Sequence, residues 1–589
     1  MVVHRDLLQR VLTVDLSRRR WWIDERPDLF DESLGGAGVA SRLLEEECPE
    51  GVDPLGEENP IIFAVGPLVG LFPLASKTVA MFKSPHTGNL GESHAGGRSA
   101  VALRLAGYGA LVIRGASTMP IYLVVERDGV RFRDASTLWG MRSSYTAGDI
   151  LRERESGAGE RSIMRIGRAG ERQVSYACVI TETYRHFGRL GLGAVFGSKR
   201  LKGLVVVGGT GLEVGDRRAY RDAYDEIFDA ATKSDLMQKY HELGTPMNVL
   251  PLNEIGALPT RNLQESRFER AEAISGERMA EEYLGRRLAC AHCPVACIHL
   301  AALRIPHPEE PYFYKTSMLG YDYEPMYALG SMVGGCDVRG MLKLMDEVEI
   351  QGLDAMSTGV VLAWATEAME RGLISTEETD GIRLAWGDYP SYMGAVRRIV
   401  SQPTDFYRAL ARGVNHAASI YGGEEFALAF GENEMPGYHT GPAAHLTYLT
   451  GARHSHLDSA GYSLDQRAAS EGMALDPAEV AESLLEEERW RQVLASLVVC
   501  YFARSIYTRD TVQRALGAVG LDWSEEDLNR LGADTLRRKY AFKVREGFEP
   551  AELRIPERIL ETPSPLGEID EEFLRKAVAH FVQEQNITV

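Results

Sequence analysis

The sequence predicts an α+β protein in which a glycine-rich β-sheet region precedes mainly helical regions. Residues 61–65, 110–113 and 121–125 are short apolar runs rich in β-branched residues, and glycine-containing turns separate them. After about residue 211, apolar residues recur every three or four positions, as in residues 217–239 and 359–371. That spacing is typical of amphipathic helices. Strands therefore fill the first third of the chain and helices most of the remainder.

Further elements follow from the same patterns. Residues 11–16 and 21–23 flank a polar turn and predict a hairpin, and residues 204–207 predict the last strand before Gly208 and Gly209. Helices are also expected over residues 340–345, 392–400 and 478–504.

At 589 residues the chain is too long for one compact core. Composition shifts near 210 and near 420–437 divide it into three expected domains. These are a β-rich base over 1–210, a helical domain over 211–425 and a C-terminal helical domain over 426–589.

The overall charge argues against two classes of partner. Lys and Arg number 65 against 84 Asp and Glu, a formal charge of −19, which disfavours nucleic acid and anionic membranes. Basic regions remain able to dock a small acidic carrier.

The start of the chain lacks a secretory signal, and seven cysteines, three of them clustered, do not resemble a disulfide framework. A cytoplasmic, reduced setting is expected.

The clustered cysteines are Cys290, Cys293 and Cys297, at C-x2-C-x3-C spacing. Thiolates at this spacing converge on one centre when the backbone coils tightly. An iron–sulfur cluster with a fourth ligand from elsewhere is one interpretation. Zinc completed by His299 is a second, and a role without metal is a third.

Two stretches concentrate small residues, 84–98 and 185–199. A helix over 99–106 is expected directly after the first, so backbone N–H groups there can face an anion. Neither stretch has the G-x-G-x-x-G or G-x-x-x-x-G-K-[ST] order of nucleotide loops. Tight turns between strands are one interpretation. A phosphate-bearing cofactor with Arg185 and Arg189 as charge partners is the other.

Taken together, several short segments of the sequence resemble those of the tungsten-dependent aldehyde:ferredoxin oxidoreductase family. The resemblance covers nearly the whole chain and is strongest before about residue 210. The matching segments are residues 35–38, 54–59, 66–70, 83–88, 106–110 and 188–202, together with the cysteine triplet. The resemblance implies a β-sheet base capped by two mainly helical domains, with the cofactors between base and caps.

Three cofactors are implied by this resemblance. They are a tungsten ion held by two pterins, with molybdenum left open as the metal, a [4Fe–4S] cluster, and Mg²⁺ bridging the pterin phosphates. The resemblance selects Cys500 as the fourth cluster ligand and leaves Cys48, Cys178 and Cys336 as ordinary cysteines.

The resemblance also implies the residues that contact the cofactors, and some depart from the family pattern. Lys77 replaces an arginine that links cluster and pterin, and His94 replaces an asparagine at the magnesium site. Glu349 replaces the first aspartate of a D-x-x-G-L-D turn, and Ala495 replaces the carboxylate of the second such turn. The full expected set is Lys77, His94, Gly96, Arg185, His186, Gly188, Arg189, Glu349, Leu353, Asp354 and Val499.

Two residues are implied to handle protons in the oxidation of an aldehyde with water to a carboxylate. Glu324 matches the active-site glutamate, and its aromatic neighbours are expected to raise its pKa and make it a base for activating water. His456 matches the active-site histidine as a hydrogen-bond donor, with His454 as the competing assignment.

The implied electron acceptor is ferredoxin or an iron–sulfur subunit, and a homodimer is left open. Lys343 and Asp346 stand where some members carry Glu-x-x-His, so no iron between subunits is expected. Two alternative functions remain open. One is a tungsten subunit like that of benzoyl-CoA reductases, and the other is a non-catalytic iron–sulfur or zinc scaffold.

Overall fold

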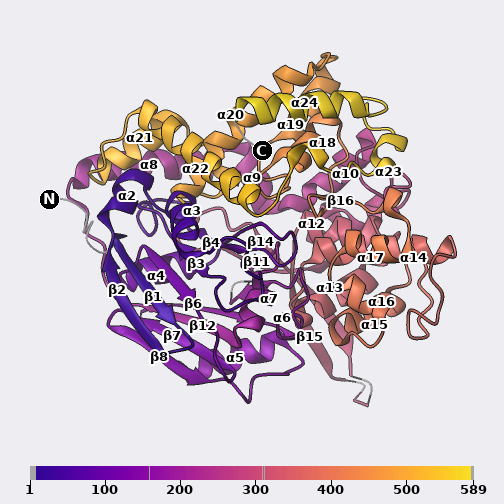
Figure 1. Ribbon diagram of the computed structural model, residues 1–589, viewed down its shortest axis with the longest axis horizontal. Helices are drawn as coiled ribbons and strands as arrows, with labels where there is room; N and C mark the ends of the chain where they lie inside the picture. The colour runs from indigo at the N-terminus through magenta and orange to yellow at the C-terminus, as the bar shows by residue number, and fades with distance from the viewer. Residues whose placement is uncertain (1–7, 158, 183, 308, 311, 586–589) are drawn as a thin grey trace.

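A computed structural model describes residues 8–157, 159–182, 184–307, 309–310 and 312–585. Two sheets form the base, drawn in indigo and purple at the lower left of Figure 1, and helices cover it from above and from the right. A hydrophobic core runs continuously from the first strand of the base to the last helix. The predicted α+β class and its sheet base are confirmed.

The first sheet has the strand order β2-β1-β6-β3-β4-β5. The predicted hairpin forms its edge, with Val14 opposite Trp21 and Leu12 opposite Ile23. The inner strands β3 and β4 are buried on both faces, which explains their continuous apolar runs. The strands are β1 (Arg10–Asp15), β2 (Arg20–Glu25), β3 (Ile61–Ala64), β4 (Thr78–Lys83), β5 (Leu90–Ala95) and β6 (Ala110–Arg114).

The second sheet has the order β11-β10-β9-β12-β7-β8. Helix α4 (Ser99–Leu105) follows the first glycine-rich stretch, as predicted, and packs against β9 and β12. Helix α7 (Leu192–Ser198) begins within the second glycine-rich stretch, after Gly191 in the left-handed region. The strands are β7 (Ile121–Glu126), β8 (Gly129–Asp134), β9 (Glu160–Ile166), β10 (Val179–Thr181), β11 (His186–Phe187) and β12 (Leu201–Gly208).

Helices dominate after β12, but the predicted 217–239 helix is interrupted. It divides into α8 (Arg217–Lys233) and α9 (Asp235–Glu242), because Ser234 adopts an extended backbone. The predicted helices over 340–345, 359–371 and 392–400 lie within α13 (Val338–Gln351), α14 (Ala355–Glu370) and α15 (Tyr389–Ser401). The division into three domains stays a prediction.

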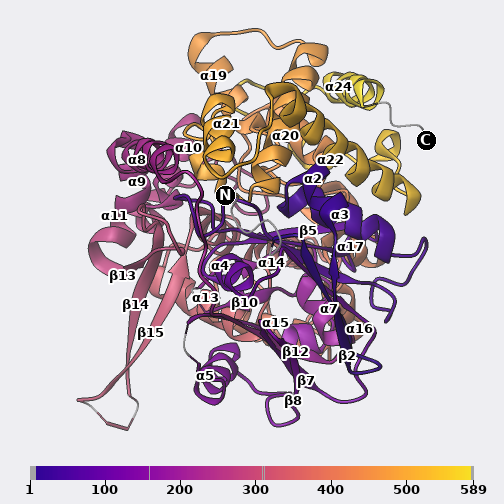
Figure 2. The ribbon, with the colours of Figure 1, turned by 90° about the vertical axis from the view of Figure 1, so that its left-hand side faces the viewer.

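A three-stranded sheet in the middle of the chain was not predicted. It consists of β13 (Leu284–Leu288), β14 (Ile298–Pro306) and β15 (Tyr314–Tyr321), with β14 between the other two. Strands β14 and β15 extend away from the body of the molecule (Figure 2). The first residues of β14 are buried on both faces, so the alternation that reveals a strand is missing.

The helix expected over 478–504 is shorter than predicted. Helix α20 (Pro477–Ser496) ends before Cys500, and Val498 has a positive φ of 56° that reverses the chain. The next residues pair with the base instead, because Lys77 N donates to Val498 O at 3.1 Å and Cys500 N donates to Leu74 O at 2.9 Å. Cys500 is therefore held by the base and not by a helix.

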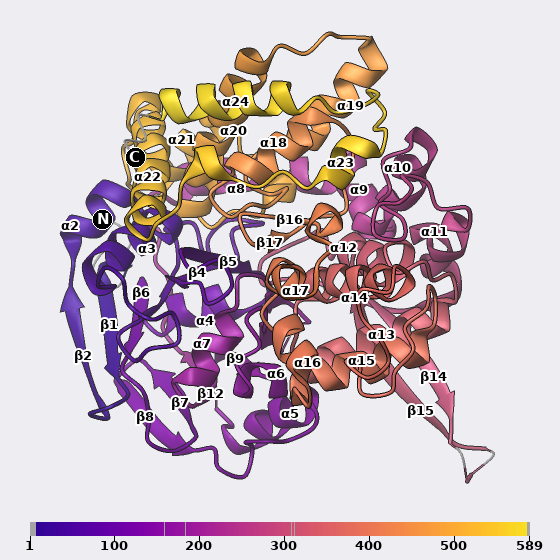
Figure 3. The same ribbon diagram turned by 45° about the vertical axis from the view of Figure 1, so that its right-hand side comes forward.

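The C-terminal helices join the base to the rest of the molecule. Helices α20 and α22 (Glu525–Arg545) pack on each other and on α3 (Gly36–Glu47) of the base, while α24 (Glu571–Glu584) packs on α20 and on α18 (Pro442–Thr450) (Figure 3). Within the described part of the chain, no helix is both long and apolar enough to cross a membrane.

Candidate active site

The four predicted cluster cysteines line one cavity of about 320 Å³, which we call the central cavity. Cys290, Cys293 and Cys297 lie in the loop that joins β13 to β14. His292 and Ala296 both have positive φ, at 56° and 53°, so the loop coils tightly. Cys500 arrives from the segment after α20. Residues 200 positions apart in the chain are thus brought to one place.

In the described part of the chain, the thiols are not placed as a ready site for a single metal ion. Among the described residues, no group of three His, Cys, Asp or Glu side chains is placed to hold one ion. A zinc ion at about 2.3 Å from each sulfur would need the thiolates to be in near contact. An iron–sulfur cluster needs the same four ligands around a larger volume. Burial raises the pKa of the Cys293 thiol to about 12 and also raises that of Cys297.

The zinc alternative with His299 is not supported. His299 Nε2 lies 2.9 Å from the carbonyl oxygen of His241, and His299 does not line the central cavity. The structure thus separates this histidine from the thiols that it was expected to join.

Lys77 and Gly96 lie directly against the cysteines. Lys77 is partly buried, and although burial lowers its pKa, the neighbouring thiols of Cys500 and Cys290 raise it more, so its pKa is above the usual value. A Cβ at Gly96 would lie 2.8 Å from Cys290 Sγ and 3.3 Å from Lys77 Nζ. A side chain at this position would therefore displace Cys290 Sγ or Lys77 Nζ. The ammonium of Lys77 keeps the charge that the expected arginine would bring.

The second glycine-rich stretch supplies two arginines and a histidine, each of which meets a carboxylate from a later part of the chain. Arg185 Nη1 lies 2.5 Å from Asp322 Oδ2. His186 Nε2 lies 2.9 Å from Glu349 Oε2, and Arg189 Nε lies 3.1 Å from Asp354 Oδ2. These contacts were not predicted, and they join the base to Asp322, which follows β15, and to α13 and α14.

Some of this stretch is nevertheless free to bind a ligand. Arg189 Nη1 is buried and has no hydrogen-bond partner among the described residues. A Cβ added at Gly188 would meet only the Cβ of His186, at 3.8 Å, so space is open on its cavity side. An unpaired buried guanidinium nitrogen beside open space fits an anionic group such as a phosphate.

The predicted pterin-binding turn joins α13 to α14. Asp354 caps α14, since its side chain accepts from Met356 N at 3.0 Å. Leu353 forms a backbone bridge with Ala177, and Val499 forms one with Ala75. The turn is therefore fixed to the base by backbone contacts as well as by the Arg189–Asp354 ion pair.

His94 belongs to a buried ionic group at the other end of the cavity. His94 Nε2 lies 2.7 Å from Glu92 Oε1, and Lys539 Nζ lies 2.5 Å from Glu92 Oε2. Burial lowers the pKa of His94 to about 4. Its imidazole is therefore neutral at physiological pH. The side chain of His94 is already paired with Glu92.

Glu324 and His456 both line the central cavity, and their side chains are in contact. Glu324 lies in α12 (Tyr323–Met326), and its Oε1 is 3.2 Å from His456 Nε2 and 3.3 Å from the hydroxyl of Tyr438. His456 Nδ1 is buried without a partner among the described residues. The pair therefore has one free hydrogen-bonding atom left for a substrate.

The expected pKa shift of Glu324 is wrong in sign. Burial alone raises the pKa of this carboxyl, as the aromatic neighbours suggested. The hydrogen bond and charge of His456, with the Tyr438 hydroxyl, lower it more, so its pKa lies below the usual value. Glu324 is therefore ionised at neutral pH.

His454, the competing histidine, points elsewhere. Its Nδ1 lies 2.8 Å from the carbonyl oxygen of Tyr448, and its Nε2 lies 2.8 Å from Lys543 Nζ on α22. It does not line the central cavity. Of the two histidines, the structure places only His456 beside Glu324.

The sequence analysis missed a buried glutamate that organises one wall of the site. Glu434 accepts from Ser357 Oγ at 2.6 Å and from Val414 N at 3.0 Å, and its Oε2 lies 2.8 Å from His86 Nε2. Its carbonyl oxygen accepts from Arg189 Nη2 at 2.7 Å. Glu434 lies in the two-residue strand β17 (Asn433–Glu434), and its side-chain partners come from other segments of the chain, so no local pattern marks it.

Comparison with known proteins assigns this site to a family. The model of the aldehyde ferredoxin oxidoreductase N-terminal domain matches residues 11–208, and that of domains 2 and 3 matches residues 222–584. The chain belongs to the aldehyde ferredoxin oxidoreductase family. It is 32% identical over 574 residues to the tungsten-containing aldehyde ferredoxin oxidoreductase of Thermococcus kodakarensis, covering 95% of this chain and 92% of that protein. It is 31% identical to that of Pyrococcus furiosus, with the same coverage.

Two further similar proteins are not named aldehyde ferredoxin oxidoreductases. A Pyrococcus furiosus protein named aliphatic sulfonate oxidoreductase, WOR-like subunit, is 30% identical over 69% of this chain and 66% of its own. A solved structure of the benzoyl coenzyme A reductase active site complex BamBC with 1,5-dienoyl-CoA superposes with a TM-score of 0.84. It covers 99% of this chain and 94% of that chain at 21% identity, and it shows the fold only.

The residues of this chain fit the tungstopterin and iron–sulfur cluster that such relatives imply. Four thiols line the central cavity, and the absence of a side chain at Gly96 leaves room for Cys290 Sγ. The unpartnered Arg189 nitrogen and the open side of Gly188 suit a pterin phosphate.

Glu434→Gln is expected to destabilise the protein at neutral pH. The variant removes the negative partner of buried His86, and breaking such a pair costs about 3 to 5 kcal/mol. The contacts of Glu434 lower its pKa to about 2, so its stabilising contribution is full above about pH 4.5 and is lost toward pH 2. Melting temperatures of the two proteins should differ by a similar amount from pH 7 down to about pH 4.5, and the difference should shrink as the pH falls toward the lowered pKa of Glu434. Equal melting temperatures at pH 7 would contradict this role.

Proposed function

We propose that this chain is a tungstopterin oxidoreductase that oxidises an aldehyde with water to a carboxylate and passes the electrons through a [4Fe–4S] cluster to ferredoxin or a similar one-electron carrier. The observation that carries the proposal is the Glu324–His456 pair, 3.2 Å apart in the cavity that the four cysteines also line. A base, a hydrogen-bonding group and an electron exit are thereby combined in one enclosed space.

When bound, the tungstopterin supplies the two-electron oxidation and the cluster supplies one-electron exit. Cys290, Cys293, Cys297 and Cys500 would hold the cluster. Arg189, Gly188 and the Leu353–Asp354 turn would hold one pterin, with Lys77 between the pterin and the thiols. The backbone near His94 would bind the Mg²⁺ between phosphates. The seven free cysteines suit the reduced, cytoplasmic setting expected from the sequence.

Glu324 acts as the base in this proposal. One aldehyde and one water give a carboxylate, two electrons and three protons, so the chain must accept protons close to the reacting carbon. The carboxylate of Glu324 is partly buried and ionised, and the hydroxyl of Tyr438 holds it in place. It can therefore take a proton from the water as the oxygen attacks.

His456 positions the aldehyde. Its Nε2–H is directed to Glu324, which leaves Nδ1 as the free ring atom. When the ring is protonated, Nδ1–H can donate to the carbonyl oxygen of the aldehyde. When the ring is neutral with its proton on Nε2, the bare Nδ1 can accept a hydrogen bond from water. The ring of Tyr438 lies 5.0 Å from that of His456 and fixes its orientation. The pair can thus bind the substrate and shift a proton without rearrangement of the chain.

Anaerobically purified protein is expected to contain tungsten or molybdenum together with iron and sulfide, and to reduce a viologen dye with at least one simple aldehyde. Metal analysis and a panel of aliphatic and aromatic aldehydes test this directly. Benzoyl-CoA belongs in the same panel, since its turnover without aldehyde turnover would favour the alternative reductase. Zinc without tungsten or molybdenum would remove the enzyme proposal altogether.

A further inference from the structure

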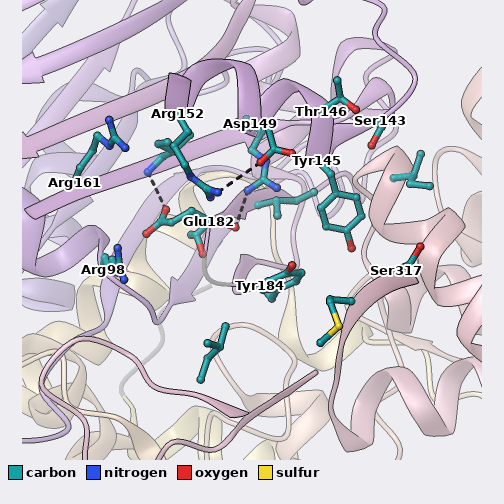
Figure 4. A pocket seen from close by; sticks show the side chains of 18 of the residues that line it. Arg98, Ser143, Tyr145, Thr146, Asp149, Arg152, Arg161, Glu182, Tyr184 and Ser317 are labelled. Carbon is teal, nitrogen blue, oxygen red and sulfur yellow. Dashed lines mark hydrogen bonds and ion pairs between the residues drawn. The ribbon is translucent and has the colours of Figure 1, made fainter. Parts of the chain in front are cut away.

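A second cavity, of about 1,100 Å³, opens between the base and the β13–β15 sheet, and we call it the basic cleft. Figure 4 shows Arg98 and Arg161 on one side of it and Ser317 on the other, with the Tyr145 hydroxyl directed into the space. Its charged lining residues are seven basic and four acidic: Arg98, Arg142, Arg152, Arg161, Arg165, Arg286, Lys315, Asp149, Glu160, Glu182 and Asp346. The cleft therefore carries a net positive charge on a chain of charge −19.

Several of these cations are available to a partner. Arg142, Arg286 and Lys315 are exposed, and no ion pair involves them among the described residues. Arg165 is buried at the floor, where it donates to the carbonyl oxygens of Ser144 at 3.1 Å and Thr181 at 2.6 Å. A surplus of unpaired cations on an acidic protein attracts an acidic partner to this face and repels it from others.

Two polar atoms of the lining also lack partners. The hydroxyl of Tyr145 and Oε1 of Glu182 are buried, and neither has a hydrogen-bond partner among the described residues. Buried polar atoms are normally paired. Both residues line the cleft.

The cleft is separated from the cluster ligands by a thin wall. Ala289 lines the basic cleft, and the next residue, Cys290, lines the central cavity. Likewise, Tyr184 lines the basic cleft, and the next residue, Arg185, lines the central cavity. A redox group held in the cleft would therefore lie close behind the thiols, which gives a short path for an electron.

The β14–β15 hairpin extends the cleft outward. Lys315 and Ser317 of β15 line the cleft, and Tyr312 and Phe313, just before this strand, are 91% and 66% exposed. The hairpin projects from the molecule in Figures 2 and 3. Aromatic residues are the usual anchors of protein interfaces, and exposed ones at the end of a basic groove favour a protein partner over a small anion.

We propose that an acidic one-electron carrier protein docks in the basic cleft, beneath the β14–β15 hairpin, and takes electrons from the cluster through the wall at Ala289–Cys290. This inference rests on the proposed function and specifies where the carrier binds. Each transfer oxidises the cluster by one electron and reduces one carrier by one electron. Two carrier molecules, or two visits by one, therefore account for each aldehyde oxidised.

The test compares two triple charge reversals in the holoenzyme. The cleft variant is Arg142→Glu, Arg286→Glu and Lys315→Glu. The control variant is Arg530→Glu, Arg537→Glu and Lys576→Glu, at exposed positions on α22 and α24. Both variants change the net charge equally. A [4Fe–4S] ferredoxin of net negative charge is the probe, and viologen reduction in the same preparations reports the site without the carrier.

The cleft variant is expected to bind the ferredoxin about tenfold more weakly or worse at low salt, by calorimetry, and to raise the KM for ferredoxin accordingly. Its viologen rate and iron content should match the wild type, and the control variant should behave as wild type in both assays. For the wild type, the KM for ferredoxin should rise steeply with ionic strength. This salt series does not depend on the folding of any variant.

Three results would overturn the proposal. One is unchanged ferredoxin binding in the cleft variant, another is an equal loss in the control variant, and the third is a KM that does not change with salt. Tight binding of an adenine nucleotide in the cleft without ferredoxin binding would assign it to a small anion and overturn the proposal as well. Failure of the proposed function is distinguishable, because it would appear as absent viologen activity in the wild type.

Discussion

Glu324→Gln is expected to lower kcat for aldehyde oxidation by about 10²- to 10⁴-fold, the usual contribution of a general base. The substitution keeps the size of the side chain and its hydrogen bond to Tyr438, but it removes the carboxylate that would accept a proton. Because Glu324 is held by His456 and Tyr438 and contacts no cysteine ligand, tungsten and iron content should stay at the wild-type level. Viologen-linked turnover per tungsten is the measurement.

The pH profile of the wild type provides an independent check. The pKa of Glu324 lies below its usual value because His456 and Tyr438 stabilise the ionised form. The base therefore remains ionised as the pH falls from 8 to 6, and kcat/KM should show no acid limb from this group over that range. An acid limb near neutrality that disappears in Glu324→Gln would instead indicate a raised pKa.

A matched control separates a specific loss from a general effect of neutralising a carboxylate. Glu486→Gln makes the same change on the exposed side of α20, where the side chain pairs only with Arg509 at 3.2 Å. It should retain full turnover. The assignment of Glu324 as the base is wrong if its glutamine variant turns over normally with full metal content.

The parts of this protein that sequence predicted are those fixed by local patterns. The 11–16 and 21–23 hairpin is set by alternation and a turn, and Val14 opposite Trp21 shows the register that the pattern implies. The C-x2-C-x3-C triplet forms one loop, because positive φ at His292 and Ala296 closes the coil within a few residues. Such features need no information from distant segments.

The missed parts depend on partners far along the chain. Glu434 meets His86 across 348 positions, and Asp322 meets Arg185 across 137. No spacing rule connects such residues. The same limit explains why the predicted direction of the Glu324 pKa shift is wrong. The aromatic neighbours that would raise this pKa are adjacent in the sequence, whereas His456, which lowers it, comes from a distant segment. Helix α20 was extended too far because the turn at Val498 is imposed by the base and not by its own residue type.

Cys500 is the site residue that the local sequence specified least, and its removal provides the second large expected effect. In Cys500→Ser, the iron content should fall well below that of the wild type. The spectroscopic signature of a reduced [4Fe–4S] cluster should be lost with it. Even an outer-shell change at a metal site costs about 10- to 100-fold, so loss of a ligand should lower carrier-linked turnover by about a hundredfold or more.

The structural reason lies in how the segment before Cys500 is held. Cys500 N donates to Leu74 O, Lys77 N donates to Val498 O, and Val499 bridges Ala75, so the backbone remains in place when the sulfur is replaced. The variant should therefore fold and keep tungsten, and only the cluster should respond. Lys77 would then lose the thiol that raises its pKa most.

Cys336→Ser is the control that makes this result specific. Cys336 is a partly buried free cysteine that packs against the main core and does not line the central cavity. The same substitution there should leave iron content, spectrum and turnover unchanged. An intact cluster in Cys500→Ser together with a lost cluster in Cys336→Ser would reassign the fourth ligand. It would also separate the electron path from the segment that follows α20.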